Sequence, residues 1–138
     1  MILFDVEADN LLEDATKIHC LSYTTDGSDY TTLFDYDEMR ELVLSQRGLI
    51  GHNIIRYDIP LLEKILDIKI TARLFDTLPM SWVLNYNRPR HGLESFGEDF
   101  GIPKPQITDW SSLSQEEYAH RCTEDVKINW QLWCNLLS

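Results

Sequence analysis

The sequence contains few residues that interrupt regular structure. Only six glycines and five prolines occur among its 138 residues, which excludes a collagen-like, linker-rich or disordered chain. No apolar run approaches the roughly 20 residues that a membrane-spanning helix needs, and Asp5 interrupts the pattern of a secretory signal sequence. Hydrophobic residues make up 43% of the chain, which is enough for a buried core. The composition therefore predicts a single domain over residues 1–138 that lies outside the membrane.

Cysteine and positive charge are also scarce. The three cysteines are odd in number and lack the close pairwise spacing of zinc knuckles, so we expect reduced thiols in a cytoplasmic protein. Twelve Lys and Arg face 23 Asp and Glu, for a net charge of −11, which argues against broad electrostatic binding to nucleic acid. An acidic site neutralised by bound cations remains compatible with this charge. The basic residues that could still make local contacts with a polyanion are Arg56, Arg73, Arg88, Arg90, Lys104 and Lys127.

The first seven residues are mostly apolar and end in a pair of carboxylates. Successive side chains of a strand alternate between its faces, so Asp5 and Glu7 would share one face while Phe4 and Val6 turn to the other. Two adjacent carboxylates repel each other unless a cation lies between them. The pair therefore indicates either a metal site or two solvated acids at the end of a strand.

The order of predicted elements indicates a mixed α/β fold. β-branched and aromatic residues predict three successive strands within residues 1–35, and the apolar run at 48–51 predicts a fourth. Asp37 would cap a short helix between them. Three strands, a helix, a strand, a helix, a strand and then further helices are typical of the ribonuclease-H-like fold, in which helices flank a mixed central sheet.

Several acidic residues fall at the starts of predicted helices. Pro60 fits the first turn of a helix that follows Asp58, so Asp58 is either a helix N-cap or a metal ligand. Asp76 would cap the next helix, and residues 114–117 have the spacing of a capping box that opens the last one. Asp125 lies beside the apolar stripe of that last helix and could project into a site at the edge of the core. The stripe, which we expect to be buried, is Val126, Trp130, Trp133 and Leu137.

Taken in order, these residues resemble the motifs of the DEDD (DnaQ-like) 3′–5′ exonucleases, especially the proofreading domains of bacteriophage A-family DNA polymerases. The matching motifs are Asp5-x-Glu7, His52-Asn53-x-x-x-Tyr57-Asp58, Asp76-Thr77 with its following helix, and Asp125-Val126. The resemblance implies that Asp76 is structural. It also implies two Mg²⁺ or Mn²⁺ ions held by four carboxylates, which are Asp5, Glu7, Asp58 and Asp125. The candidate substrate contacts are Asn53, Arg56, Tyr57 and Arg121, with Arg88, Arg90 and Lys104 as further candidates.

The activity that the resemblance implies is removal of nucleoside 5′-monophosphates from the 3′ end of single-stranded DNA. Two divalent ions about 3.5–4 Å apart serve the attacking and leaving oxygens in such sites, and hard ions prefer oxygen ligands. Zinc is not expected, because no Cys/His ligand set is visible. Single strands or frayed 3′ ends would be the partners, with a DNA polymerase either fused to the chain or recruited in trans. An exoribonuclease acting on short RNA and a catalytically silent binding module are the alternatives.

The general base is the point at which the chain departs from the family. The polymerase-linked branch has a Tyr four residues before the last Asp, where this chain has Arg121, and the other main branch has a His five residues before it, which matches His120. In an unbroken helix, position 121 shares the face of Asp125, whereas position 120 points about 140° away.

Chemistry and helix geometry favour different residues as the base. Arg cannot accept a proton in a protein, whereas His titrates near neutrality. We therefore assign the general base to His120, with Arg121 contacting phosphate or solvent. This assignment requires a helix that is interrupted or bent near residue 120. The alternative is a His that is merely exposed on the helix surface.

Overall fold

The computed structural model describes residues 1–102 and 113–138. Its centre is a five-stranded mixed sheet of order β3-β2-β1-β4-β5. The first three strands form an antiparallel meander, while the last two run parallel to the first. The strands are β1 (Ile2–Ala8), β2 (Ile18–Thr24), β3 (Tyr30–Leu33), β4 (Gly48–Gly51) and β5 (Arg73–Asp76). The predicted order of elements is confirmed.

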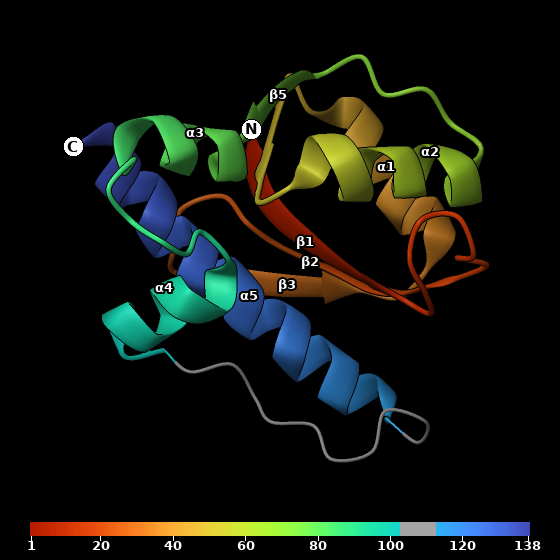
Figure 1. Ribbon diagram of the computed structural model, residues 1–138. Coiled ribbons are helices and arrows are strands. Elements are labelled where there is room, and N and C mark those ends of the chain that lie inside the picture. The colour runs from red at the N-terminus through yellow and green to blue at the C-terminus, as the bar shows by residue number, and fades with distance from the viewer. Residues whose placement is uncertain (103–112) are drawn as a thin grey trace.

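Helices cover both faces of the sheet. In Figure 1, the long helix α5 runs across one face with α3 and α4 beside it, whereas α1 and α2 pack on the other. Their bounds are α1 (Tyr36–Ser45), a single π-helical turn η1 (Ile54–Asp58) that continues into α2 (Ile59–Leu66), α3 (Thr77–Leu84), α4 (Leu93–Phe100) and α5 (Gln115–Leu137). Within the described ranges, no helix combines the length and the hydropathy that crossing a bilayer requires.

Strand β1 divides the core into two layers. Phe4 is 1% exposed and packs in the cluster formed with α1 and α2, whereas Leu3 packs with Val126 of α5 on the opposite face. Asp5 and Glu7 follow Leu3 on that second face. The alternation predicted from the sequence therefore places both carboxylates on the side of the sheet that α5 covers.

Two local predictions are wrong. Helix α1 is capped by the side chain of Asp35, and Asp37 lies in its first turn. At the other end of the chain, Leu137 is 62% exposed. The buried face of the last turns follows Leu132 and Leu136, which pack against α4, because the apolar contacts of α5 shift from the sheet to α4 near its C-terminus.

Gly97 allows α4 to approach α5 closely. A Cβ added at this residue would lie 2.5 Å from the carbonyl oxygen of Ile102 and 2.8 Å from Ile128 Cδ1. We expect Gly97→Ala to lower the free energy of unfolding by about 1–3 kcal/mol, because overpacking forces the neighbouring groups apart. Urea unfolding at equilibrium measures this difference.

Gly92→Ala is the matched control for that substitution. A Cβ at Gly92 would meet nothing within 4 Å, and its position as the N-cap of α4 should limit the cost to less than about 1 kcal/mol. Equal losses of stability in the two variants would contradict the packing explanation.

Candidate active site

The two carboxylates of β1 meet helix α5 near the carboxyl end of the strand. The ligand atoms of Asp5, Glu7 and Cys122 all lie within 4.8 Å of one another. Asp125 is 5% exposed and lies three residues after Cys122, on the same face of the helix. β1 and α5 therefore supply three carboxylates and a thiol to one part of the molecule.

The fourth carboxylate, Asp58, comes from the turn η1. It has helical backbone angles and makes no side-chain capping bond to α2, so its interpretation as a helix N-cap is wrong. Burial above all, together with the charges of Glu7 and Asp76, raises the pKa of Asp58 well above its usual range, although hydrogen bonding to the Val6 backbone opposes this. Because the charge of Glu7 contributes to this shift, Asp58 lies close enough to the β1 pair for their charges to interact.

The environment of Asp58 fits a bound cation. Its side chain is 3% exposed, and among the residues that the structure describes its Oδ2 atom has no hydrogen-bond partner. A buried carboxylate oxygen that lacks a donor is costly. A divalent ion with oxygen ligands would remove that cost, so the residues present fit the Mg²⁺ or Mn²⁺ that the sequence predicts.

Asp76 holds η1 in place. The backbone N–H of Asn53 donates to Asp76 Oδ1 at 2.7 Å, and that of Ile55 donates to Oδ2 at 3.1 Å. Asp76 also caps α3 by accepting from the N–H of Leu78. Asn53 has a left-handed conformation, with φ of 63°, which Asn adopts more readily than most residues. These bonds agree with the structural role predicted for Asp76.

The candidate substrate contacts fall into two groups. Asn53 and the exposed Arg56 line a cavity of about 230 Å³ together with Trp82. Tyr57 instead donates its hydroxyl to the carbonyl oxygen of Asn10 at 2.9 Å. Burial, followed by the charge of Asp58, raises the pKa of Tyr57 to about 12. Its hydroxyl therefore stays protonated and already has an acceptor.

The predicted interruption of the last helix is wrong. Helix α5 is continuous over Gln115–Leu137 and opens with the predicted capping box at Ser114. His120 is exposed, whereas Arg121 Nε lies 3.5 Å from Glu7 Oε1. Because residue 120 points away from the face that carries the site, the geometry does not support His120 as general base, and that assignment stays a prediction. Arg121 is the residue that faces the carboxylates.

Cys122 is the site residue that the sequence analysis missed. Its Sγ donates to the carbonyl oxygen of Asp5 at 3.2 Å and lies 3.5 Å from Asp5 Oδ2. Burial first of all, and then neighbouring Cys20, raise the pKa of this thiol well above its usual range. Its position three residues before Asp125 was the available signal, because that spacing puts both residues on one helix face.

Thr77 connects the site to the rest of the sheet. Its hydroxyl donates to the carbonyl oxygen of Gly51 at 3.2 Å and accepts from Asn129 Nδ2 at 2.8 Å. The same hydroxyl lies 2.8 Å from His52 Nδ1. Asn129 lies one turn after Asp125 on α5, so this buried network sets the position of Asp125 relative to β4 and α3.

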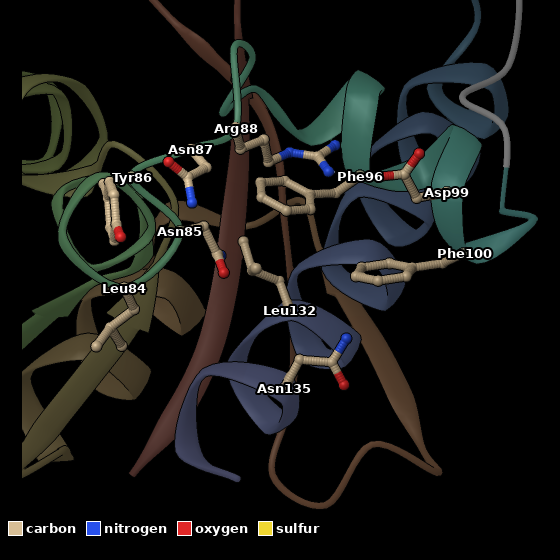
Figure 2. Close-up of a pocket in the computed structure, with 10 residues that line it drawn as sticks. All are labelled: Leu84, Asn85, Tyr86, Asn87, Arg88, Phe96, Asp99, Phe100, Leu132 and Asn135. Carbon is tan, nitrogen blue, oxygen red and sulfur yellow. Dashed lines mark hydrogen bonds and ion pairs between the residues drawn. The ribbon is translucent and has the colours of Figure 1, made fainter.

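Arg88 is engaged elsewhere. Figure 2 shows its side chain extending over the ring of Phe96, 4.0 Å from the centroid, toward its ion-pair partner Asp99. These residues line a cavity of about 430 Å³ between the loop after α3, α4 and the end of α5. In the described part of the chain, the wall of this cavity includes none of the four carboxylates. Arg90 is exposed, and the remaining candidate contact, Lys104, lies outside the described residues.

Two bacteriophage proteins resemble the chain in sequence. It is 31% identical over 101 residues to the DNA-directed DNA polymerases of Escherichia phage T7 and Enterobacteria phage T3. Each match covers 63% of this chain and 14% of the polymerase, so the chain corresponds to a small part of those proteins. No family model matches the chain.

Solved nuclease structures share the whole fold. A structure described as the apo form of the nuclease has a TM-score of 0.77 and 19% identity, over 98% of this chain and 70% of that chain. Brucella melitensis NrnC bound to pGG has a TM-score of 0.76 and 19% identity, over the same shares. Exonuclease X in complex with 5′ overhanging duplex DNA has a TM-score of 0.67 and 11% identity, over 99% and 90%.

The chain has a DnaQ-like exonuclease fold. The ribonuclease-H-like architecture and the resemblance to DnaQ-like exonucleases predicted from the sequence are thereby confirmed.

The buried carboxyl group of Asp58 makes the stability of the metal-free protein depend on pH. The folded-state pKa of Asp58 lies above the usual 3.8, so between these two values the folded state binds more protons than the unfolded state. The free energy of unfolding therefore falls as pH rises through that interval. We expect Asp58→Asn to abolish this fall and to be more stable than the parent at neutral pH in EDTA.

Urea unfolding of both proteins across a pH series measures the effect. Asp37→Asn is the control, because that side chain is 88% exposed on α1 and its removal should leave the pH profile unchanged. A metal-free Asp58→Asn protein that is less stable than the parent at neutral pH would show that the carboxylate is satisfied without a cation.

Proposed function

We propose that the chain is a metal-dependent 3′–5′ exonuclease that acts on single-stranded DNA and releases nucleoside 5′-monophosphates. The observation that carries the proposal is the buried Asp58 oxygen, which has no donor among the residues that the structure describes. It accompanies a pair of carboxylates on β1 and a helix that brings Asp125. The sequence match to phage polymerases and the fold shared with nucleases support it.

The chain's own residues account for most of the site. Its four carboxylates, Asp5, Glu7, Asp58 and Asp125, would hold two Mg²⁺ or Mn²⁺ ions through oxygen. When bound, such ions supply Lewis-acid stabilisation and an activated water. Arg121, next to Glu7, would contact a phosphate oxygen of the substrate, because guanidinium groups bind phosphate well. Asn53 and Arg56 line the cavity that would receive the terminal nucleotide.

Charge and strand pairing together favour single strands. A chain with a net charge of −11 has little basic surface, so its contacts with nucleic acid should be few, local and sensitive to salt. Separating the strands of a paired end costs free energy, whereas a frayed or mismatched end is already unpaired. We therefore propose frayed 3′ ends as substrates, beside a DNA polymerase that is fused to the chain or recruited in trans.

A second candidate is an exoribonuclease acting on short RNA. NrnC was solved with pGG, so short oligonucleotides belong among the substrates to be tested. A catalytically silent module that binds nucleic acid or a partner is the third, and the presence of all four carboxylates argues against it.

Digestion of 5′-labelled strands with and without Mg²⁺ tests the proposed function. We expect single-stranded DNA to shorten stepwise from its 3′ end, faster than a blunt duplex of the same sequence. Asp5→Asn, Glu7→Gln, Asp58→Asn and Asp125→Asn should each lower turnover roughly 100-fold or more, because each weakens the stabilisation of developing charge. The exposed Asp37→Asn serves as the control and should retain activity.

Each alternative has its own outcome in this assay. Faster digestion of RNA than of DNA would favour the exoribonuclease. Binding of Mn²⁺ and DNA without any cleavage would favour the silent module. Cleavage that persists in EDTA would contradict both nuclease proposals.

The general base is tested by a pair of adjacent substitutions. Because α5 is unbroken and His120 is exposed, the geometry taken alone predicts that His120→Ala leaves kcat nearly unchanged. Arg121→Ala should raise KM, since the guanidinium faces the carboxylates whose bound ions would hold the substrate phosphate. If His120→Ala instead lowers kcat by about 10²–10⁴ and removes the acidic limb of the pH profile, His120 is the base and the first turns of α5 must open during turnover.

A further inference from the structure

We propose that this site also binds a thiophilic divalent ion of the Zn²⁺ or Cd²⁺ class, through Asp5, Glu7 and Cys122. Such an ion would compete with Mg²⁺ and inhibit the nuclease. The inhibition rests on the proposed function, whereas the binding depends only on the three side chains. From the sequence alone zinc was not expected, because no Cys/His ligand set is visible.

The separation of two ligand atoms carries the inference. Cys122 Sγ lies 3.5 Å from Asp5 Oδ2. In a tetrahedral site, a Zn–S distance of about 2.3 Å and a Zn–O distance of about 2.0 Å place the sulfur and the oxygen roughly 3.5 Å apart. The thiol and the carboxylate therefore already stand at the spacing of two ligands to one zinc ion.

Glu7 offers the third ligand. Its carboxylate oxygen lies within 4.8 Å of the other two ligand atoms and needs to approach them by roughly 1 Å, which rotation about its side-chain bonds provides. A water molecule would complete four-coordination. Glu7 Oε1 also lies 3.5 Å from Arg121 Nε, so binding of the ion would loosen an existing ion pair.

Asp58 independently indicates a cation at this position. Its side chain is 3% exposed, and Oδ2 has no hydrogen-bond partner in the described part of the chain. The charge of Glu7 contributes to the raised pKa of Asp58, so Asp58 lies close enough to the carboxylates of β1 to interact with them electrostatically. An ion held by Asp5 and Glu7 would therefore also offset the buried charge of Asp58.

Binding exchanges one bond for another without electron transfer. The Cys122 thiol, which donates to the Asp5 carbonyl oxygen at 3.2 Å, would release its proton to solvent as the sulfur–metal bond forms. Mg²⁺ prefers oxygen ligands, so the Cys122 sulfur would add little to its affinity. Both classes of ion would use Asp5 and Glu7 as ligands, and Cys122 would favour the thiophilic class over Mg²⁺.

The test measures metal binding by the metal-free protein. Cd²⁺ bound to a thiolate gives a charge-transfer absorption in the ultraviolet, and competition with a chromogenic chelator gives the Zn²⁺ affinity. We expect Cys122→Ser to lose the Cd²⁺ absorption and to weaken Zn²⁺ binding roughly 10- to 100-fold, while Mn²⁺ affinity changes by less than about threefold. Cys122→Ala is the second variant, and thermal unfolding shows which of the two is folded.

Cys134 supplies the control. It is exposed and lies outside the three-residue group. Cys134→Ser should retain the absorption, whereas Cys20 adjoins Cys122 and is unsuitable as a control. The proposal would be overturned if Cys122→Ser keeps the absorption or binds Zn²⁺ with unchanged affinity. Loss of the absorption in Cys134→Ser would also overturn it.

Failure of this inference differs from failure of the proposed function. A parent protein that binds no Mn²⁺ and cleaves no strand defeats the proposed function, yet a Cd²⁺ signal that depends on Cys122 would still stand. Conversely, an active nuclease whose Zn²⁺ affinity does not depend on Cys122 would contradict this inference but not the proposed function. In the active protein, Zn²⁺ should raise the Mg²⁺ concentration needed for half-maximal rate.

Discussion

Repulsion among carboxylates is the constraint on which the arrangement of this protein depends. Elements far apart in the sequence bring negative charge to one end of the sheet, and the most deeply placed group, Asp58, is buried. Like charges at short range destabilise one another, and burial adds a desolvation cost. A proton, the Arg121 guanidinium or a bound cation would offset that cost, and the folding free energy of the chain would then depend on what occupies the site.

Two consecutive residues at the junction of β5 and α3 hold the converging elements against this repulsion. Asp76 accepts hydrogen bonds from the turn that carries Asp58, and Thr77 accepts one from Asn129 on the helix that carries Asp125. Each bond joins buried or half-buried groups, where an unsatisfied partner is costly. The junction between a short edge strand and α3, which contributes none of the four carboxylates, therefore helps to position two of them.

The fold and the positions of the acids could be predicted because they depend on local rules. Alternation along β1 placed Asp5 and Glu7 on one face, and cap and turn residues marked most helix starts. The remaining features depend on tertiary contacts. The π-helical turn that carries Asp58 is stabilised by Asp76, which comes from another element, and no periodicity announces it. The proximity of Cys122 to Asp5 requires the packing of α5 on β1, which helical spacing alone does not supply.

The unbroken course of α5 has a consequence for how the chain can vary in length. Arg121, Cys122, Asp125 and Asn129 occupy one rigid rod, so they keep a common angular phase around its axis. An insertion or deletion of one residue between Cys122 and Asp125 would rotate the helix before it by about 100° relative to the helix after it. The side chains of Arg121 and Cys122 would then no longer share a face with Asp125. Individual side chains on the rod can be exchanged one at a time, whereas its register can change only as a whole.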